Sequence, residues 1–202
     1  ANAYIIRMEP RGRQIFFAPD VVREYRIAEG LAKADLPTAP LHAVETDESI
    51  LGAPFMVMGE VAGRAPLGRP SMHTSGLLTE LNEAECARLS GNAIDVLAQF
   101  HSADWRSTHP FLANDNSGLD HHLDHLARWY DWTVQGRSFP SIDAALAHLQ
   151  SARAGLADVP DVLLWGDARP GNILFAADQS VAAVLDLEAA LIGPRGLDLG
   201  YW

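Results

Sequence analysis

Residues 165–175 read WGDARPGNILF, and residues 184–188 read VLDLE. Asp167 follows a short apolar run, Asn172 comes five positions later, and Asp186 follows a second short apolar run. The pattern predicts a loop that carries Asp167 and Asn172, then a short strand, a turn and a second strand that ends at Asp186. Polar side chains on loops beside short strands can be exposed on a rigid base, so we expect these three residues to share one site.

This order of side chains suits phosphoryl transfer. Asp167 can face an attacking hydroxyl and accept its proton, while Asn172 and Asp186 can hold the Mg²⁺ that accompanies ATP. Taken alone, Asp167 has an ordinary alternative as a turn residue that bonds its own backbone. Asp186 favours the site, because a charge at the end of a buried strand is costly unless it is paired or bound to metal. Glu188 is either a second metal contact or a solvent-facing side chain.

The composition is that of an ordinary globular protein. The 202 residues, 48% of them hydrophobic and 20% charged, suffice for one core or for two small lobes around a cleft. No apolar run approaches the ~20 residues that a membrane helix needs, and the first residues show no secretory pattern. The single cysteine, Cys86, excludes an internal disulfide. We therefore expect a cytoplasmic protein without a membrane partner.

The formal net charge is −11. This charge argues against nucleic acid as a partner, because phosphate backbones are bound by basic patches. It is compatible with a cationic small-molecule substrate, although acidic surfaces usually confer only solubility. The sequence carries no signal for the oligomeric state.

The apolar patterns predict an α+β fold with two lobes. A strand at 3–8, a helix that begins at Asp20 and a strand at 55–58 form a small first lobe over residues 1–58. Residues 59–66 are rich in Gly and Pro and are expected to form a hinge, which places a larger, mainly helical lobe at 67–202.

Three helices are expected in the larger lobe, at 82–101, 119–133 and 141–154. Asn82 with Glu85 three positions later resembles a capping box at the start of the first helix. Short strands at 162–164, 173–175 and 182–185 lie close together in the sequence. We expect them to form one small ribbon that carries the site.

Together these segments resemble the aminoglycoside phosphotransferase-like family of small-molecule kinases, which have a protein-kinase-like fold. The family motif is His-Gly-Asp followed, after four further residues, by Asn and later by a second Asp. Residues 165–172 and Asp186 are similar to this motif. Further similar stretches follow in the family's order along nearly the whole chain, at 4–7, 23–26, 52–63, 97–105 and 196–200. The chain is most similar to the branch found with acyl-CoA dehydrogenases.

The resemblance implies that ATP and Mg²⁺ are the cofactors and that the γ-phosphoryl group passes to a hydroxyl of a small molecule. It implies that Asp167 is the catalytic carboxylate and that Asn172 and Asp186 are the metal ligands. Five further residues are implied to contact the nucleotide directly or to position the residue that does: Arg7, Glu24, Met58, Glu60 and Val61.

Three departures from the family pattern bear on activity. Trp165 replaces the usual His and would have to support the loop by packing. Arg7 replaces a phosphate-binding Lys, and the two side chains are not equivalent, although Arg is a good phosphate ligand. The glycine-rich loop of the family would precede residue 1, so we expect the chain to be a fragment of a longer protein. A catalytically impaired nucleotide-binding relative is the main alternative.

Two other functions compete: a zinc-dependent hydrolase built on the histidines at 121–125, and a protein kinase. His121 and His125 are four apart, a spacing that can bind zinc, although a polar helix face is the ordinary explanation for these residues and His122. Trp129 and Trp132 would pack in the core or, alternatively, form a wall of the substrate site. A protein kinase is disfavoured, because the sequence after Asp186 lacks the Asp-Phe-Gly and Ala-Pro-Glu motifs.

Overall fold

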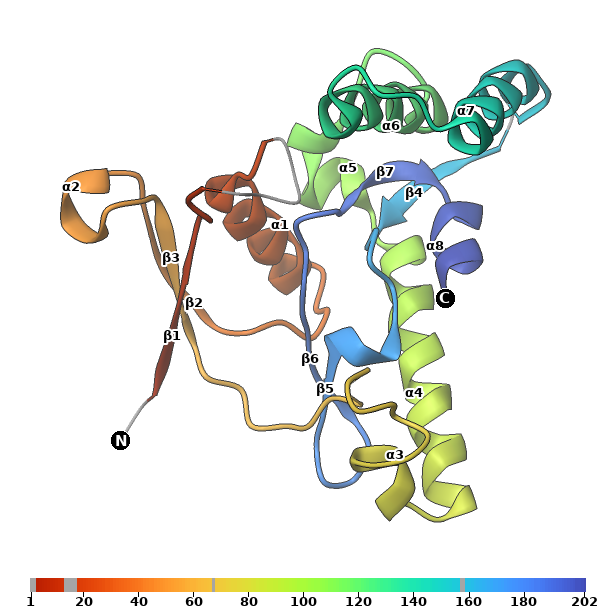
Figure 1. The fold of residues 1–202 in the computed structure, drawn as a ribbon. Helices are drawn as coiled ribbons and strands as arrows, with labels where there is room; N and C mark the ends of the chain where they lie inside the picture. The colour runs from red at the N-terminus through yellow and green to blue at the C-terminus, as the bar shows by residue number, and fades with distance from the viewer. Residues whose placement is uncertain (1–2, 13–17, 67, 157–158) are drawn as a thin grey trace.

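The computed structural model describes residues 3–12, 18–66, 68–156 and 159–202. Residues 1–2, 13–17, 67 and 157–158, which belong to the expected lobes, therefore lie outside the described residues. Helices combine with small antiparallel sheets in this part of the chain (Figure 1), and this arrangement confirms the predicted α+β class. The division into 1–58, 59–66 and 67–202 stays a prediction.

The first sheet has the strand order β1-β3-β2. Strand β1 (Tyr4–Met8) and strand β2 (Leu41–Glu45) both pair antiparallel with the central strand β3 (Phe55–Gly59). The short helix α2 (Glu48–Leu51) joins β2 to β3. Strand β2 was absent from the sequence-based prediction, because Pro37 and Pro40 directly precede it and suggest a break.

Helix α1 (Val21–Lys33) begins where the sequence predicts, because the Asp20 side chain accepts a hydrogen bond of 2.8 Å from the backbone N–H of Arg23. One face of α1 is buried and includes Glu24, Ile27 and Leu31. The helix lies between the first sheet and the rest of the molecule (Figure 1) and contacts β2, β3 and α5.

The second half of the chain is mainly helical. The capping box at Asn82 is confirmed, because Asn82 accepts from the Glu85 N–H at 3.0 Å and Glu85 accepts from the Asn82 N–H at 2.9 Å. The expected third helix ends at Ala152 and continues as a 3₁₀ turn, Arg153–Leu156. The α-helices are α3 (Leu77–Glu80), α4 (Glu83–Ser102), α5 (Trp105–Thr108), α6 (Gly118–Val134), α7 (Pro140–Ala152) and α8 (Gly196–Tyr201).

The strands around the site form two pairs. Strand β5 (Ile173–Phe175) pairs with β6 (Val181–Val184), as expected, but β4 (Asp161–Leu164) pairs with β7 (Leu191–Pro194). The prediction of one ribbon containing 162–164 was therefore wrong. Residues 162–164 of β4 are buried, and β7, which the sequence pattern did not indicate, supplies their backbone partners.

A single cluster of buried apolar side chains joins the two halves of the chain. It contains Ile27 and Leu31 from α1, Leu97 and Phe100 from α4, and Trp165 beside the site. Within the described residues, no helix is both long enough and apolar enough to cross a bilayer.

Candidate active site

The loop with Asp167 is held by a buried carboxylate behind it. Asp198, at 1% exposure, accepts hydrogen bonds of 2.9 Å from the backbone N–H groups of Trp165 and Gly166. Its carboxylate also lies 3.0 Å from His101 Nε2. Gly166 has φ +84, and a Cβ there would lie 2.2 Å from the Ala189 carbonyl oxygen. Only glycine fits, so the turn before Asp167 is fixed by backbone geometry and by Asp198.

Trp165 supports the loop in two ways. Its ring stacks on Phe100, with centroids 5.5 Å apart and an interplanar angle of 11°. Its indole Nε1–H donates to the carbonyl of Leu185 at 2.9 Å. The side chain that replaces the family's His therefore both packs in the core and connects the Asp167 loop to the residue before Asp186.

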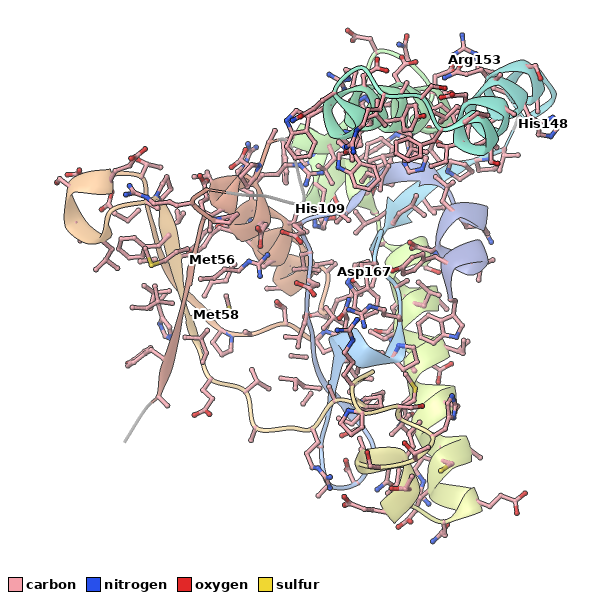
Figure 2. All side chains as sticks on the ribbon, in the orientation of Figure 1. Met56, Met58, His109, His148, Arg153 and Asp167 are labelled. Atoms are coloured by element: carbon pink, nitrogen blue, oxygen red, sulfur yellow. The ribbon has the colours of Figure 1, made fainter. Side chains whose placement is uncertain are left out.

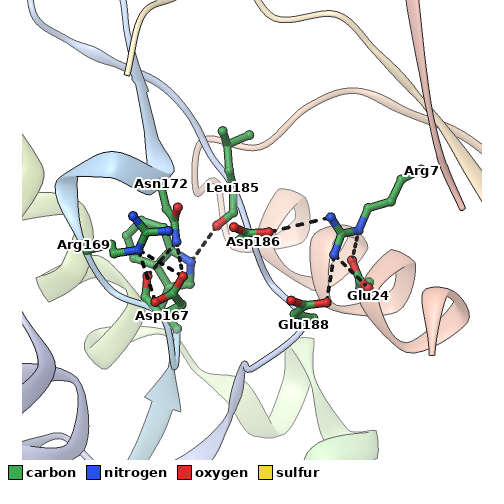
Figure 3. Close-up of polar contacts among 9 residues, drawn as sticks. Arg7, Glu24, Asp167, Arg169, Asn172, Leu185, Asp186 and Glu188 are labelled. Atoms are coloured by element: carbon green, nitrogen blue, oxygen red, sulfur yellow. Dashed lines mark hydrogen bonds and ion pairs between the residues drawn. The ribbon is translucent and has the colours of Figure 1, made fainter. Parts of the chain in front are cut away.

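Three side chains donate to the carboxylate of Asp167. Asn172 Nδ2 donates to it at 2.5 Å and Arg169 Nε lies 3.2 Å from Oδ2 (Figure 3). The Tyr201 hydroxyl donates a further hydrogen bond. Burial acts to raise the pKa of Asp167, but the bonds from Tyr201 and Asn172 and the charge of Arg169 outweigh burial and lower this pKa. Asp167 is therefore held ionised.

A backbone bond places Asp186 beside the loop. The Leu185 N–H donates to the Asn172 carbonyl at 2.8 Å, so Asp186 follows directly after a residue that is fixed to the loop. Asp186 has φ +55, in the left-handed region, where a residue is often held by the needs of a site. An amide oxygen from Asn172 and a carboxylate from Asp186 are hard oxygen ligands of the kind that suits Mg²⁺ together with substrate phosphates.

Arg7 connects β1 to three carboxylates (Figure 3). Its guanidinium lies 2.5 Å from Glu24, 3.0 Å from Glu188 and 3.7 Å from Asp186. Burial acts to lower the pKa of Arg7, but these carboxylates outweigh it and raise the pKa. Burial raises the pKa of Glu24, and the charge of Arg7 opposes this shift. Glu188 is therefore paired with Arg7 and does not simply face solvent.

A cavity of about 390 Å³ lies between the first sheet and the segment that carries Asp186. Arg7, Glu24, Met58 and Asp186 line it, together with apolar side chains that include Met56 and Leu185. Figure 2 shows Met56 and Met58 on the sheet that forms one wall. The structure thus brings together three of the five residues that the resemblance assigns to the nucleotide site: Arg7, Glu24 and Met58. Glu60 and Val61 follow β3 and are not among the lining residues.

The histidines of α6 do not form a zinc site. Among the residues that the structure describes, no three His, Cys, Asp or Glu side chains are placed to hold one metal ion. His121, His122 and His125 instead line a second cavity with Trp129. The alternative of a zinc-dependent hydrolase is therefore not supported by the described geometry.

Sequence reasoning did not identify Asp198, Trp165 Nε1 or Tyr201 as parts of this site. Asp198 lies within residues 196–200, which resemble a stretch of the family sequence. Its hydrogen-bond partners, Trp165 and Gly166, are 33 and 32 residues away in the chain. A buried carboxylate that accepts backbone N–H groups leaves no local pattern in a sequence.

A mainly helical body, a small antiparallel sheet and a loop with Asp167 and Asn172 define a kinase-like α+β phosphotransferase fold. The model of the phosphotransferase enzyme family matches residues 2–202, and the chain belongs to this family.

Individual relatives agree with this assignment. The chain is 31% identical over 204 residues to acyl-CoA dehydrogenase family member 11 of Gallus gallus, covering 99% of this chain and 25% of that protein. A solved Ralstonia eutropha protein assigned to the aminoglycoside phosphotransferases shares 25% identity with a TM-score of 0.73, over 98% of this chain and 56% of that one. A thermostable mutant of another aminoglycoside phosphotransferase shares 14% identity and the fold, with a TM-score of 0.58, over 88% of this chain and 59% of that one.

Proposed function

We propose that this chain catalyses the Mg²⁺-dependent transfer of the γ-phosphoryl group of ATP to a hydroxyl group of a small molecule. One observation carries the proposal: the backbone hydrogen bond from Leu185 to Asn172 joins the loop of Asp167 to the segment of Asp186, and Asp186 lines a cavity together with Arg7 and Glu24. A base, two oxygen ligands and a phosphate-binding cation are the parts that this reaction needs.

The reaction assigns a role to each side chain. Asp167 orients the acceptor hydroxyl and accepts its proton as the new oxygen–phosphorus bond forms and the bond from the γ-phosphorus to the ADP oxygen breaks. Arg7 holds the α- and β-phosphates, with Glu24 as its positioning partner, and the backbone near Met58, Glu60 and Val61 contacts adenine. Asn172 and Asp186 would hold Mg²⁺, which supplies neutralisation of the phosphate charge.

The comparisons support nucleotide binding in this fold. The thermostable aminoglycoside phosphotransferase described above was solved as a ternary complex with ADP and hygromycin B. The acidic charge and the single cysteine favour a cytoplasmic setting, without nucleic acid or membrane partners.

Calorimetry with ATP and Mg²⁺ tests the proposal. Asp186→Asn keeps the size of the side chain and tolerates a positive φ, but removes one charge from the metal ligands. We expect this variant to lose at least about tenfold in Mg²⁺-dependent ATP affinity. Asp178→Asn removes the same charge from the exposed turn between β5 and β6 and should bind as the unchanged chain does. Equal, Mg²⁺-independent binding by all three proteins would contradict the proposal.

A catalytically impaired relative is the second candidate, and the contacts of Arg7 favour it specifically. Arg7 is already paired with Glu24, Asp186 and Glu188, so ATP phosphates would have to compete for its guanidinium. Tight Mg²⁺-ATP binding without ADP production, across a screen of hydroxylated acceptors, would support this candidate.

A further inference from the structure

A second cavity of about 420 Å³ adjoins the Asp167 loop on the side of α6. Gly166, the residue before Asp167, forms part of its wall, and so does Tyr201, whose hydroxyl donates to the Asp167 carboxylate. If Asp167 is the base, as in the proposed function, this cavity lies beside the base and has room for the body of the acceptor. The volume suits a small molecule.

The wall of this cavity is mostly apolar. Helix α6 contributes Leu126 and Trp129, and the strands and α8 contribute Leu164, Leu191 and Leu197. An ammonium group that entered such a wall would lose water without gaining a partner, which is costly. Apolar carbons would instead gain from leaving water there.

The carboxylates of the wall are already engaged. Among the described residues that line the cavity, the acids are Glu188 and Asp198. Glu188 pairs with Arg7 at 3.0 Å. Asp198 is buried and accepts from two backbone N–H groups. Neither carboxylate offers the unpaired negative charge that a molecule with several amines would require.

The remaining polar groups of the wall are basic or neutral. Arg23 donates to the backbone carbonyls of Glu188 and Ala190, so it carries its positive charge into the wall. Burial, reinforced by the neighbouring basic groups, lowers the pKa of His122 and of His125. These two rings are neutral at neutral pH, and a neutral imidazole can donate to or accept from a hydroxyl. Protonation of these two rings would add positive charge to the wall, which would repel a protonated amine.

We propose that this cavity binds a hydroxyl compound whose body is apolar and uncharged, and that it discriminates against polyamines such as aminoglycosides. The acceptor class would then differ from that of the solved aminoglycoside phosphotransferases that share the fold. That the ligand is the acceptor of the phosphoryl group rests on the proposed function. The preference for apolar ligands follows from the residues that line the cavity.

Two probes test this preference by calorimetry near neutral pH: a vicinal octanediol, which is apolar and uncharged, and kanamycin, a polyamine. We expect the diol to bind at least about tenfold more tightly than kanamycin. Kanamycin binding that equals or exceeds diol binding would overturn the proposal. Failure of the diol to bind would overturn it as well.

Substitutions in the wall locate the binding. Leu126→Glu should weaken the diol at least about fivefold, because a carboxylate replaces apolar contact. Leu149→Glu makes the same change on the exposed face of α7 and should leave diol binding unchanged. Leu126→Ala, which carries no buried charge, should weaken the diol in the same direction, and circular dichroism checks that each variant is folded. Diol binding that is unaffected by both Leu126 variants would place the ligand elsewhere and overturn the proposal.

Binding of Mg²⁺-ATP is measured in parallel on the same proteins. Diol binding without nucleotide binding would contradict the proposed kinase function and support the proposed ligand preference. Nucleotide binding together with a preference for kanamycin would support the proposed kinase function and contradict the proposed ligand preference.

Discussion

The carboxylate of Asp167 is the residue on which the proposed chemistry depends most. Asn172, Arg169 and Tyr201 all donate to it, and together they hold it ionised. A carboxylate with a lowered pKa is a weak base. Its main contribution is therefore to orient the acceptor hydroxyl and to take its proton late in the transfer.

Asp167→Asn should lower the rate of phosphoryl transfer by about 10²–10⁴-fold, because the amide cannot accept the proton. Mg²⁺-ATP affinity should change little, since the metal ligands and Arg7 remain. The measurement is the single-turnover rate of ADP formation with a saturating acceptor, alongside calorimetry. A rate within a few-fold of the unchanged chain would show that Asp167 is not the base.

Tyr201→Phe should raise the pKa of Asp167. The Tyr201 hydroxyl donates to the ionised carboxylate and is one of the groups that lower its pKa, so removal of the hydroxyl disfavours the charged form. NMR titration of the Asp167 carboxyl carbon measures the shift directly. An unchanged titration would mean that the bond from Tyr201 does not form in solution.

Among the elements, α1 and α5 are joined by His109, which is fully buried. Its Nε2 lies 3.0 Å from the Ile27 carbonyl, and a Cβ on Gly30 would lie 2.4 Å from the same nitrogen. Burial lowers the pKa of His109, although the bond to Ile27 opposes this shift. The ring is therefore neutral in the folded chain at neutral pH.

This burial makes stability depend on pH. Below about pH 6.5 the unfolded chain binds a proton at His109 that the folded chain refuses, so stability falls as the pH falls. The slope from one such histidine is at most about 1.4 kcal/mol per pH unit. His122 and His125 contribute with the same sign. Urea unfolding at several pH values should show a shallower slope for His109→Gln than for the unchanged chain. Equal slopes would contradict this account.

The elements that the sequence predicted are those with local signals. Asp20 and Asn82 lie next to the N–H groups that they cap, and Asp167 and Asn172 are five residues apart, so their geometry is set by a short stretch of chain. The pairing of β4 with β7 depends on residues about 30 positions apart. The hydrogen bonds of Asp198 to the loop also join residues more than 30 positions apart in the sequence. Such partners are selected by packing of the whole molecule, which no local pattern reports.

For the whole molecule, one shared core predicts one unfolding transition. Leu31 of α1 and Leu97 of α4 belong to the same buried cluster, so loss of either should destabilise all of it. Leu31→Ala and Leu97→Ala should each lower the free energy of unfolding by about 2–5 kcal/mol and shift a single calorimetric transition. Two separate transitions, each moved by only one variant, would show that the two parts unfold independently.

The ion pair between Arg7 and Glu24 joins strand β1 to helix α1, and α1 is fixed in the core. Any rotation of the first sheet away from α1 would separate these two charges. The Glu24 side chain is only 9% exposed, so without its guanidinium the carboxylate would take up a proton more readily. Opening of the cavity beneath the sheet and proton uptake by the protein are therefore thermodynamically linked.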